Sequence, residues 1–187
     1  MSLSIVDQIY LAIFIIIILP LFYVEYYERR YTRISPTSTL PWVRKKVLEL
    51  LAEELKDKRD VKIAELGAGW GDLSFAVHKK FSFKATITSY ELSPYPYLIC
   101  RLKKLLNRRN VAFTRKDFFK EDLSSYDILV AYLAPWIMKD LQAKIEREEM
   151  KNFTLVTMSF RLGDLKPHET HIVDFKIDKI PIYIYRF

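Results

Sequence analysis

The stretch Ile63-Ala64-Glu65-Leu66-Gly67-Ala68-Gly69-Trp70-Gly71-Asp72 begins as an apolar run and ends in glycines at every second position. Such a switch predicts a buried strand that enters a tight turn, followed by a helix from about Asp72. Glycine suits the turn because a ligand must approach the backbone closely and because φ can be positive there. The N–H groups of the first helical turn then point at the ligand. The stretch therefore predicts a loop that binds a nucleotide-like molecule.

The spacing of these glycines distinguishes between two kinds of nucleotide site. The dinucleotide fingerprint, GxGxxG, places its third glycine three positions after the second, where this chain has Asp72. Here the third glycine comes earlier, at Gly71, and a carboxylate, Glu65, ends the strand. An acidic start followed by GxGxG resembles the first motif of the seven-strand S-adenosylmethionine (SAM) methyltransferases, where the carboxylate can attract the sulfonium and amino group of the methionine part. The alternatives are another nucleotide and a glycine turn without a ligand. The resemblance implies SAM as cofactor, bound at Glu65, Gly67, Ala68, Gly69 and Gly71.

A second acidic residue, Glu91, ends the next strand-like run, Ile87-Thr88-Ser89-Tyr90-Glu91-Leu92. It lies about 20 residues past Gly71, the spacing at which an acidic side chain accepts hydrogen bonds from both ribose hydroxyls of a nucleotide. This pairing supports a ligand that carries a ribose. It does not separate SAM from NAD, because both contain one.

The composition fits one domain with a short extension. Of the 187 residues, 50% are hydrophobic, which is enough for a real core, and the formal net charge is +7. The single cysteine, Cys100, excludes a disulfide within the chain and fits a reducing, cytoplasmic-type environment. We interpret Cys100 as a packing residue rather than a nucleophile.

Residues 1–27 are predicted to form an N-terminal transmembrane anchor. No charged residue occurs from Ile9 to Val24, and a helix from Ile5 to Val24 would be roughly 30 Å long, the thickness of a bilayer core. A cleaved signal peptide fits less well, because no Lys or Arg precedes the apolar run and no clear small-residue cleavage site follows it. The alternative is a helix that docks on the domain or lies in the membrane interface.

The residues after the apolar run predict its orientation. Tyrosines suited to a membrane interface are followed by three arginines, Arg29, Arg30 and Arg33. By the positive-inside rule, the N-terminus lies outside and the rest of the chain on the cytoplasmic side, or on the equivalent matrix side of an organelle. A short juxtamembrane linker, 28–41, then keeps the methyltransferase domain, 42–187, near the membrane surface.

The remaining pattern predicts alternating strands and helices. Strands are expected at 61–66, 84–91, 111–114, 126–133 and 153–160, helices at 42–56, 72–80, 97–108 and 137–148, and a terminal hairpin at 171–177 and 180–186, joined by Asp178-Lys179. Thr39 is the expected N-cap of the first of these helices, residues 93–96 are expected to form a turn, and the leucines of 97–108 are expected to face the core. The sum is an α/β fold, a Rossmann-like seven-strand methyltransferase sheet with helices on both faces and a C-terminal antiparallel hairpin.

Candidate ligand residues fall at the carboxyl ends of the predicted strands, where open α/β sheets bind ligands. Glu65, Glu91, Asp117 and Ala134-Pro135 all lie at such ends. In methyltransferases an Asp after the third strand often meets the adenine amino group, with the next residue beside the ring; Asp117 and Phe118 match that position.

The order of these parts resembles one group of methyltransferases, the small membrane-tethered lysine methyltransferases whose mitochondrial members modify ATP synthase subunit c and the adenine nucleotide translocase. Those proteins have an N-terminal hydrophobic segment, a Pro-Thr element, the glycine motif and a Tyr-Glu-Leu-Asn-Pro motif. This chain has Tyr90-Glu91-Leu92-Ser93-Pro94, with Ser in place of Asn; Leu92 is counted among the cofactor residues. Ala134-Pro135 stands for the family's Val-Pro, and Phe160-Arg161 for its Arg-Phe in reversed order. The resemblance covers about 36–187 and implies methyl transfer to a lysine of a membrane or membrane-associated protein.

A lysine substrate must lose its proton, because its free pKa is about 10.4, and a partly dry pocket favours the neutral amine. Aromatic walls can hold the ammonium or the methylated product; Tyr132, Trp136 and Trp70 are candidates. Many amino methyltransferases carry an Asp/Asn-Pro-Pro-Tyr element after the fourth strand. This chain lacks that polar clamp, which argues against a planar nucleobase amine and leaves the carbonyl of Leu133 or Ala134 to orient the substrate. The expected catalytic set is Tyr132, Ala134, Pro135 and Trp136.

Two rival functions stay open. One is a membrane-bound methyltransferase that acts on a lipid or quinone, and the other is a non-catalytic module that binds SAM or another nucleotide. A metal is not expected, because His168 and His171 have no third ligand nearby in sequence. Nucleic acid is not an expected partner, because the basic helix faces lack interleaved aromatic residues.

Overall fold

A computed structural model describes residues 4–27, 30, 37–107, 111–175 and 178–187. The chain divides into two compact units, residues 1–36 and 37–187. Arg29 and Arg33, named in the sequence analysis, lie outside the described residues.

The N-terminal unit is helical from Ile5 to Tyr27. It consists of α1 (Ile5–Ile13), a π-helical segment (Phe14–Ile18) and α2 (Leu19–Tyr27). Ser4 and Asp7 form a capping box: the Ser4 side chain accepts from Asp7 N at 3.2 Å, and the Asp7 carboxylate accepts from Ser4 N at 3.1 Å. By length and composition, Ile5–Tyr23 is able to cross a bilayer.

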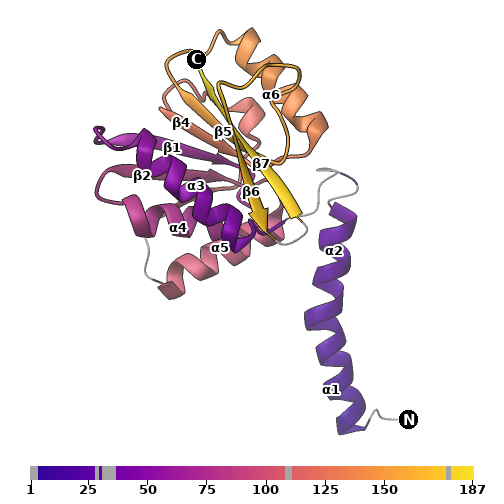
Figure 1. Cartoon of the computed structure of the whole chain (residues 1–187). Helices are drawn as coiled ribbons and strands as arrows, with labels where there is room; N and C mark the ends of the chain where they lie inside the picture. Colours follow the sequence, from indigo (N-terminus) through magenta and orange to yellow (C-terminus); the bar gives the residue numbers. More distant parts are fainter. Residues whose placement is uncertain (1–3, 28–29, 31–36, 108–110, 176–177) are drawn as a thin grey trace. The chain divides into compact units, whose positions relative to one another are not determined.

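The second unit is built on a seven-stranded sheet with the order β3-β2-β1-β4-β5-β7-β6 (Figure 1). Its strands are β1 (Val61–Leu66), β2 (Ala85–Tyr90), β3 (Ala112–Thr114), β4 (Ile128–Ala131), β5 (Thr154–Met158), β6 (Glu169–Phe175) and β7 (Asp178–Arg186). The first five strands are parallel, and β7 pairs antiparallel with both β5 and β6. This confirms the predicted methyltransferase-type sheet with its C-terminal hairpin.

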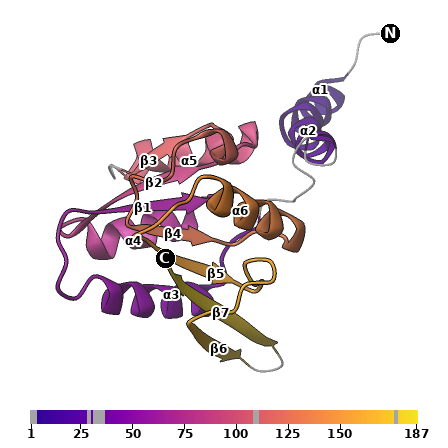
Figure 2. The ribbon, with the colours of Figure 1, turned by 90° about the horizontal axis from the view of Figure 1, so that it is seen from above.

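Helices cover both faces of the sheet, as predicted (Figure 2). One core joins α3 (Pro41–Glu54) and α4 (Asp72–Phe81) to the sheet and also includes Cys100 of α5 (Pro94–Asn107). The other core lies under α6 (Pro135–Arg147). Successive residues of β1 serve opposite cores, with Ile63 in the first and Ala64 in the second, so both faces of this strand are buried.

Three local predictions were wrong. The N-cap of α3 is Leu40 without a side-chain bond, because Pro41 occupies the first helical position and needs no N–H partner. The expected turn at 93–96 is the start of α5, which begins at Pro94 for the same reason. The expected Asp178-Lys179 connection belongs to β7, where Asp178 pairs with Phe175.

The leucine face of α5 also differs from the prediction. Leu98, Leu102, Leu105 and Leu106 are exposed by 62%, 50%, 74% and 73%, whereas Cys100 is fully buried. The helix packs beside β3, an edge strand of only three residues (Figure 2). Because so short a strand offers little sheet surface, only the Cys100 side of α5 is covered.

Candidate active site

The glycine loop joins β1 to α4 and is pinned to the neighbouring strand. The N–H groups of Gly67 and Ala68 both donate to the Tyr90 carbonyl, at 3.0 and 2.8 Å. Gly67, Gly69 and Gly71 have φ values of +81°, +51° and +78°, the left-handed region that favours glycine. The backbone of the loop is therefore set by the end of β2, and its shape requires the residue type that the sequence places there.

A side chain would not fit at two of these glycines. A Cβ on Gly71 would lie 2.9 Å from the Cys100 Sγ and 3.1 Å from the Phe113 ring, and a Cβ on Gly67 would lie 2.8 Å from Leu133. The loop thus packs closely against α5, β3 and the end of β4. This tight backbone cradle at the carboxyl ends of the strands fits a nucleotide-like cofactor.

Glu91 connects the glycine loop to the start of α5. Its two carboxylate oxygens accept hydrogen bonds from Gly69 N and Ser93 N, both at 2.7 Å, and only 8% of the residue is exposed. A carboxylate can accept about four hydrogen bonds, so Glu91 is able to hold two backbone donors at once. The structure thus brings together the two motifs that the sequence analysis singled out.

Glu65 lies beneath the loop, between the end of β1 and the first turn of α4. Its carboxylate accepts a hydrogen bond from the Ser74 hydroxyl, which in turn accepts from Ser89 at 2.8 Å. The residue is 5% exposed, and burial raises the pKa of its carboxyl from 4.5 to about 8, against the hydrogen bonds from the two serines. Sequence reasoning missed Ser74 and Ser89, because each is adjacent to Glu65 only through the fold.

Asp117 and Phe118 follow β3 on a short 3₁₀ helix, Phe118–Lys120. The Asp117 side chain caps this helix by accepting from Phe119 N at 3.1 Å. The Phe118 and Phe119 rings pack together, with centroids 4.4 Å apart. Asp117 and Phe118 are half-buried at the carboxyl side of β3, the position expected for residues beside an adenine ring.

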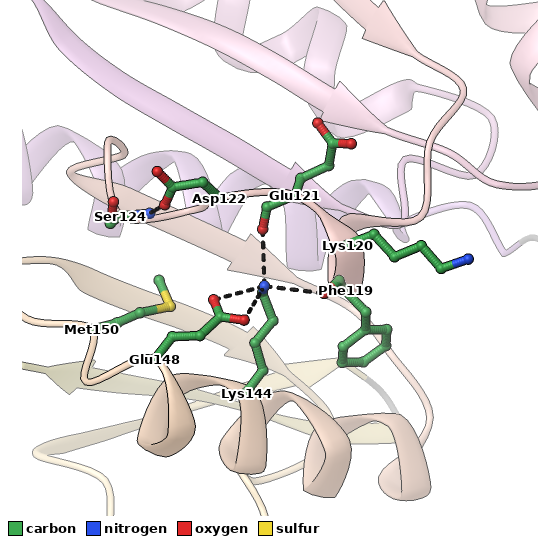
Figure 3. A pocket seen from close by; sticks show the side chains of 8 residues that line it. All are labelled: Phe119, Lys120, Glu121, Asp122, Ser124, Lys144, Glu148 and Met150. Carbon is green, nitrogen blue, oxygen red and sulfur yellow. Dashed lines mark hydrogen bonds and ion pairs between the residues drawn. The ribbon is translucent and has the colours of Figure 1, made fainter.

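A buried lysine fastens this segment to α6 (Figure 3). Lys144 is 2% exposed, and its ammonium donates to the Phe119 and Glu121 carbonyls at 3.1 and 2.9 Å and to Glu148 at 2.7 Å. This contact holds the pKa of the Glu148 carboxyl below its ordinary value. Sequence reasoning missed Lys144, because a lysine on an amphipathic helix is ordinarily solvent-exposed.

The pocket beside Lys144 is not the candidate cofactor site. It has a volume of about 360 Å³ and is lined by Phe119, Lys120, Glu121, Asp122, Ser124, Lys144, Glu148 and Met150. Some of these residues lie in the loop between β3 and β4, and the others lie in the last turns of α6 or just after it. The glycine loop and Glu91 lie elsewhere, at the carboxyl ends of β1 and β2. We therefore interpret the Lys144 cluster as structural support for the Asp117 segment.

The end of β4 presents the expected substrate residues. Tyr132 is half-buried, Ala134 is the N-cap of α6, Pro135 occupies the first helical position and Trp136 is 53% exposed. The Ala134 carbonyl accepts from Ile137 N and Met138 N, both at 3.0 Å. Of the two carbonyls considered from sequence, that of Ala134 is thus engaged by its own helix.

Two further elements border the loop. Trp70 packs edge-on against Tyr95, with ring centroids 6.1 Å apart, and its carbonyl accepts from the Lys103 ammonium at 2.9 Å. The backbone of Thr37 passes close enough that a Cβ on Gly69 would lie 3.1 Å from the Thr37 carbonyl oxygen. Thr37 was missed from sequence, although the Pro-Thr element of the resembled family includes this position.

No group of three or more His, Cys, Asp or Glu side chains that could hold a metal occurs within the described residues. His171 contacts Glu169 at 2.9 Å, and His168 Nδ1 accepts from Arg186 N at 3.2 Å. Burial raises the pKa of the Cys100 thiol to about 12, so this residue is not a nucleophile at neutral pH.

Comparison with known proteins places this geometry in a family. The model of the ANTKMT methyltransferase domain matches residues 65–169, more than half of the chain. A curated relative, the "Putative protein N5-glutamine methyltransferase" of Methanocaldococcus jannaschii, is 27% identical over 97 residues, which are 52% of this chain and 48% of the relative. The chain thus spans about half the length of that relative.

Solved structures share the fold. An RNA methyltransferase from Salinibacter ruber in complex with S-adenosyl-L-homocysteine superposes with a TM-score of 0.64 at 19% identity, over 80% of this chain and 94% of that one. The magnesium protoporphyrin IX methyltransferase of Synechocystis PCC 6803 with bound SAM gives 0.59 at 12% identity, over 87% and 94%. The cofactor is S-adenosylmethionine, and the chain belongs to the ANTKMT methyltransferase domain family of SAM-dependent methyltransferases.

Proposed function

We propose that this chain is a membrane-anchored SAM-dependent methyltransferase that methylates a lysine of a membrane or membrane-associated protein. The observation that carries the proposal is the joining of the two motifs, because the Glu91 carboxylate is held at 2.7 Å by the glycine loop itself. This arrangement orients an acidic acceptor beside a backbone cradle. It matches the needs of a ribose next to a methionine tail.

The residues around the cradle take separate parts of the cofactor. Glu91 accepts hydrogen bonds from the ribose hydroxyls, and Asp117 accepts from the adenine amino group. Phe118 and the 37% exposed Leu92 flank the ring. The loop residues Gly67, Ala68 and Gly69 accommodate the methionine part, with the Glu65 carboxylate beneath them. When bound, SAM supplies an electrophilic methyl group, and the protein contributes orientation and electrostatics.

The substrate amine enters at the end of β4. Because the Ala134 carbonyl is engaged within α6, the Leu133 carbonyl is the better candidate to accept a hydrogen bond from the amine. Trp136, half-exposed, and Tyr132, half-buried, supply aromatic surface for an ammonium or a methylated product. Partial desolvation here lowers the pKa of a lysine and favours the neutral, nucleophilic amine.

We further propose that residues 1–27 anchor the enzyme, with 28–41 as linker and 42–187 as methyltransferase domain. The helix Ile5–Tyr23 has the length and composition of a membrane span. Arg30, which follows this helix and is exposed, favours the cytoplasmic or matrix-equivalent side for the domain. A cleaved signal sequence predicts a shorter mature chain, so the mass of the protein isolated from its own membranes distinguishes the two.

A glutamine side chain is the second candidate substrate, because the curated relative carries that activity in its name. An amide nitrogen is a weaker nucleophile than an amine and needs acceptors that withdraw its protons. The end of β4 offers Ala134, Pro135 and Trp136, none of which has a side-chain acceptor. This composition favours an aliphatic amine over an amide.

The test is transfer of labelled methyl from SAM by the detergent-solubilised full chain to membranes of the source cell. Glu91→Gln removes the carboxylate charge at the cofactor site, and Glu49→Gln, an exposed α3 carboxylate paired with Lys46, is the matched control. We expect a labelled protein band that is lost with the first variant and kept with the second. Amino-acid analysis of that band should give methyl-lysine.

Three other outcomes would contradict methylation of a protein lysine. Methylglutamine in the hydrolysate would assign the glutamine activity, and label in the organic extract would assign a lipid or quinone substrate. SAM binding without any transfer would favour a non-catalytic module.

A further inference from the structure

Helix α5 carries its apolar face outward. Leu98, Leu102, Leu105 and Leu106 recur at i, i+4, i+7 and i+8, which places them on one side of the helix, and each is at least half exposed. We call these four residues the leucine face. The opposite side of α5 is closed, since Cys100 is fully buried and its thiol donates to the Gly69 carbonyl at 3.3 Å. The helix therefore cannot rotate to bury its leucines without breaking the wall of the cofactor site.

A basic side chain borders the leucine face. Arg101 is exposed, and its guanidinium hydrogen-bonds to the Tyr97 hydroxyl at 3.0 Å one turn earlier on α5. Lys104 follows Cys100 by one turn and is partly exposed on that side of the helix, so Arg101 is the cation next to the leucines. Long cationic side chains beside exposed leucines are the composition of helices that lie in the plane of a membrane surface, where the stems follow the apolar layer and the charged ends reach the headgroups.

We propose that α5 is an interfacial helix whose leucine face inserts into the headgroup layer of an anionic bilayer. The inference rests on the proposed anchor, because residues 28–36, between α2 and Thr37, can span at most roughly 35 Å and so confine the domain near the membrane that the anchor crosses. The helix starts directly after Glu91–Ser93, so membrane contact would place the candidate cofactor site close to the lipid surface.

Charge complementarity favours lipid over a second copy of the chain. A symmetric dimer through the leucine face would bring the Arg101 side chains of two copies to the same interface, and like charges across an interface weaken association. An anionic headgroup layer instead attracts the basic side chains. Each Lys or Arg near the surface raises the membrane affinity by about a factor of five. The formal charge of +7 for the whole chain acts in the same direction.

The experiment measures membrane depth on the full chain, reconstituted into bilayers of phosphatidylcholine with or without phosphatidylserine. A nitroxide label on Leu105→Cys reports on the leucine face, and a label on Phe14→Cys reports on the anchor. The control is a label on Ile172→Cys, because Ile172 is an apolar residue of β6 that is 55% exposed. The native Cys100 is buried, and the wild-type chain controls for its labelling. Power saturation then compares access by oxygen, which concentrates in lipid, with access by a water-soluble nickel chelate.

We expect the Leu105 label to be open to oxygen and shielded from nickel in the anionic bilayer, and the Ile172 label to show the reverse. Adding Arg101→Glu should lower the membrane-contacting population of the Leu105 label roughly fivefold or more, because a cation beside the leucine face is replaced by an anion. Nickel access at Leu105 while Phe14 is embedded would overturn the inference and leave the anchor standing. Nickel access at both positions would overturn both, and shielding from both reagents in particles with two chains would assign the face to a dimer.

Discussion

Compared with the wild-type domain, the Glu65→Gln variant should become increasingly stable as the pH rises, because the wild type loses stability and the variant does not. In the folded chain the carboxyl has a pKa of about 8, against 4.5 for the exposed group, so the folded state holds a proton that the unfolded state releases between these values. Stability contributed by this group is present at low pH and is lost as the pH rises through that window. Each pH unit corresponds to about 1.4 kcal/mol, so the wild-type chain should lose a few kcal/mol between pH 5 and pH 8 that the variant keeps.

The assay is the free energy of unfolding by urea, measured for wild type and Glu65→Gln in the same detergent from pH 5 to pH 8. Subtracting one from the other removes the contributions of all other titrating groups. The gap should be small at about pH 5 and should widen with pH in favour of the variant. A gap that does not change with pH would refute the reasoning, because it would mean that Glu65 ionises in the folded state as it does in water.

The same substitution, Glu65→Gln, should lower the affinity of the domain for SAM. A bound sulfonium and ammonium favour the ionised carboxylate, so SAM binding to the wild-type chain should release a proton and tighten as the pH rises toward about 8. Glu65→Gln should abolish this pH dependence. Proton uptake or release measured by calorimetry in buffers of different ionisation enthalpy checks the linkage, and a pH-independent affinity of the wild-type chain would speak against contact between Glu65 and the cofactor.

Three further substitutions test other parts of the site. Gly71→Ala forces a side chain into left-handed backbone and to within 2.9 Å of the Cys100 Sγ, so SAM affinity should fall at least tenfold and thermal stability should drop; unchanged affinity in calorimetry would contradict the cradle. Lys144→Met strips Glu148 and two carbonyls of their buried cation and should lower the free energy of unfolding by about 2–4 kcal/mol in urea titrations, whereas a neutral result would show that water replaces the ammonium. Trp136→Ala should lower kcat/KM for the protein substrate by about tenfold with SAM affinity unchanged, and an equal loss of SAM affinity would place this ring at the cofactor instead.

Local pattern was sufficient for the strand that leads into the glycine loop. The bounds of β1 were predicted to the residue, because an apolar run that ends in spaced glycines has few other solutions. Glu91 could be proposed as a ribose acceptor from sequence, since a strand end and a spacing of about 20 residues are both visible in the chain. The sequence did not show that Glu91 binds the loop directly, since this contact between Glu91 and Gly69 forms only in the fold.

The errors arose where tertiary context decides. The spacing of Leu98, Leu102 and Leu105 shows that α5 is amphipathic but not which side faces the sheet, and the short β3 left the leucines outside. Nothing in the sequence singled out Lys144, which the fold buries against the segment that precedes β4. Neither result could be reached from periodicity alone, because both depend on which segments the sheet brings together.

The account depends most directly on SAM binding at the glycine loop and Glu91, which hydrogen-bond to each other. The decisive measurement is titration of the full chain with SAM, S-adenosylhomocysteine and NAD by calorimetry, alongside Glu91→Gln and the control Glu49→Gln. The account predicts saturable binding of SAM and S-adenosylhomocysteine that is lost with Glu91→Gln and unchanged with Glu49→Gln, and no binding of NAD. Binding of NAD in place of SAM, or SAM affinity that is indifferent to Glu91, would contradict it.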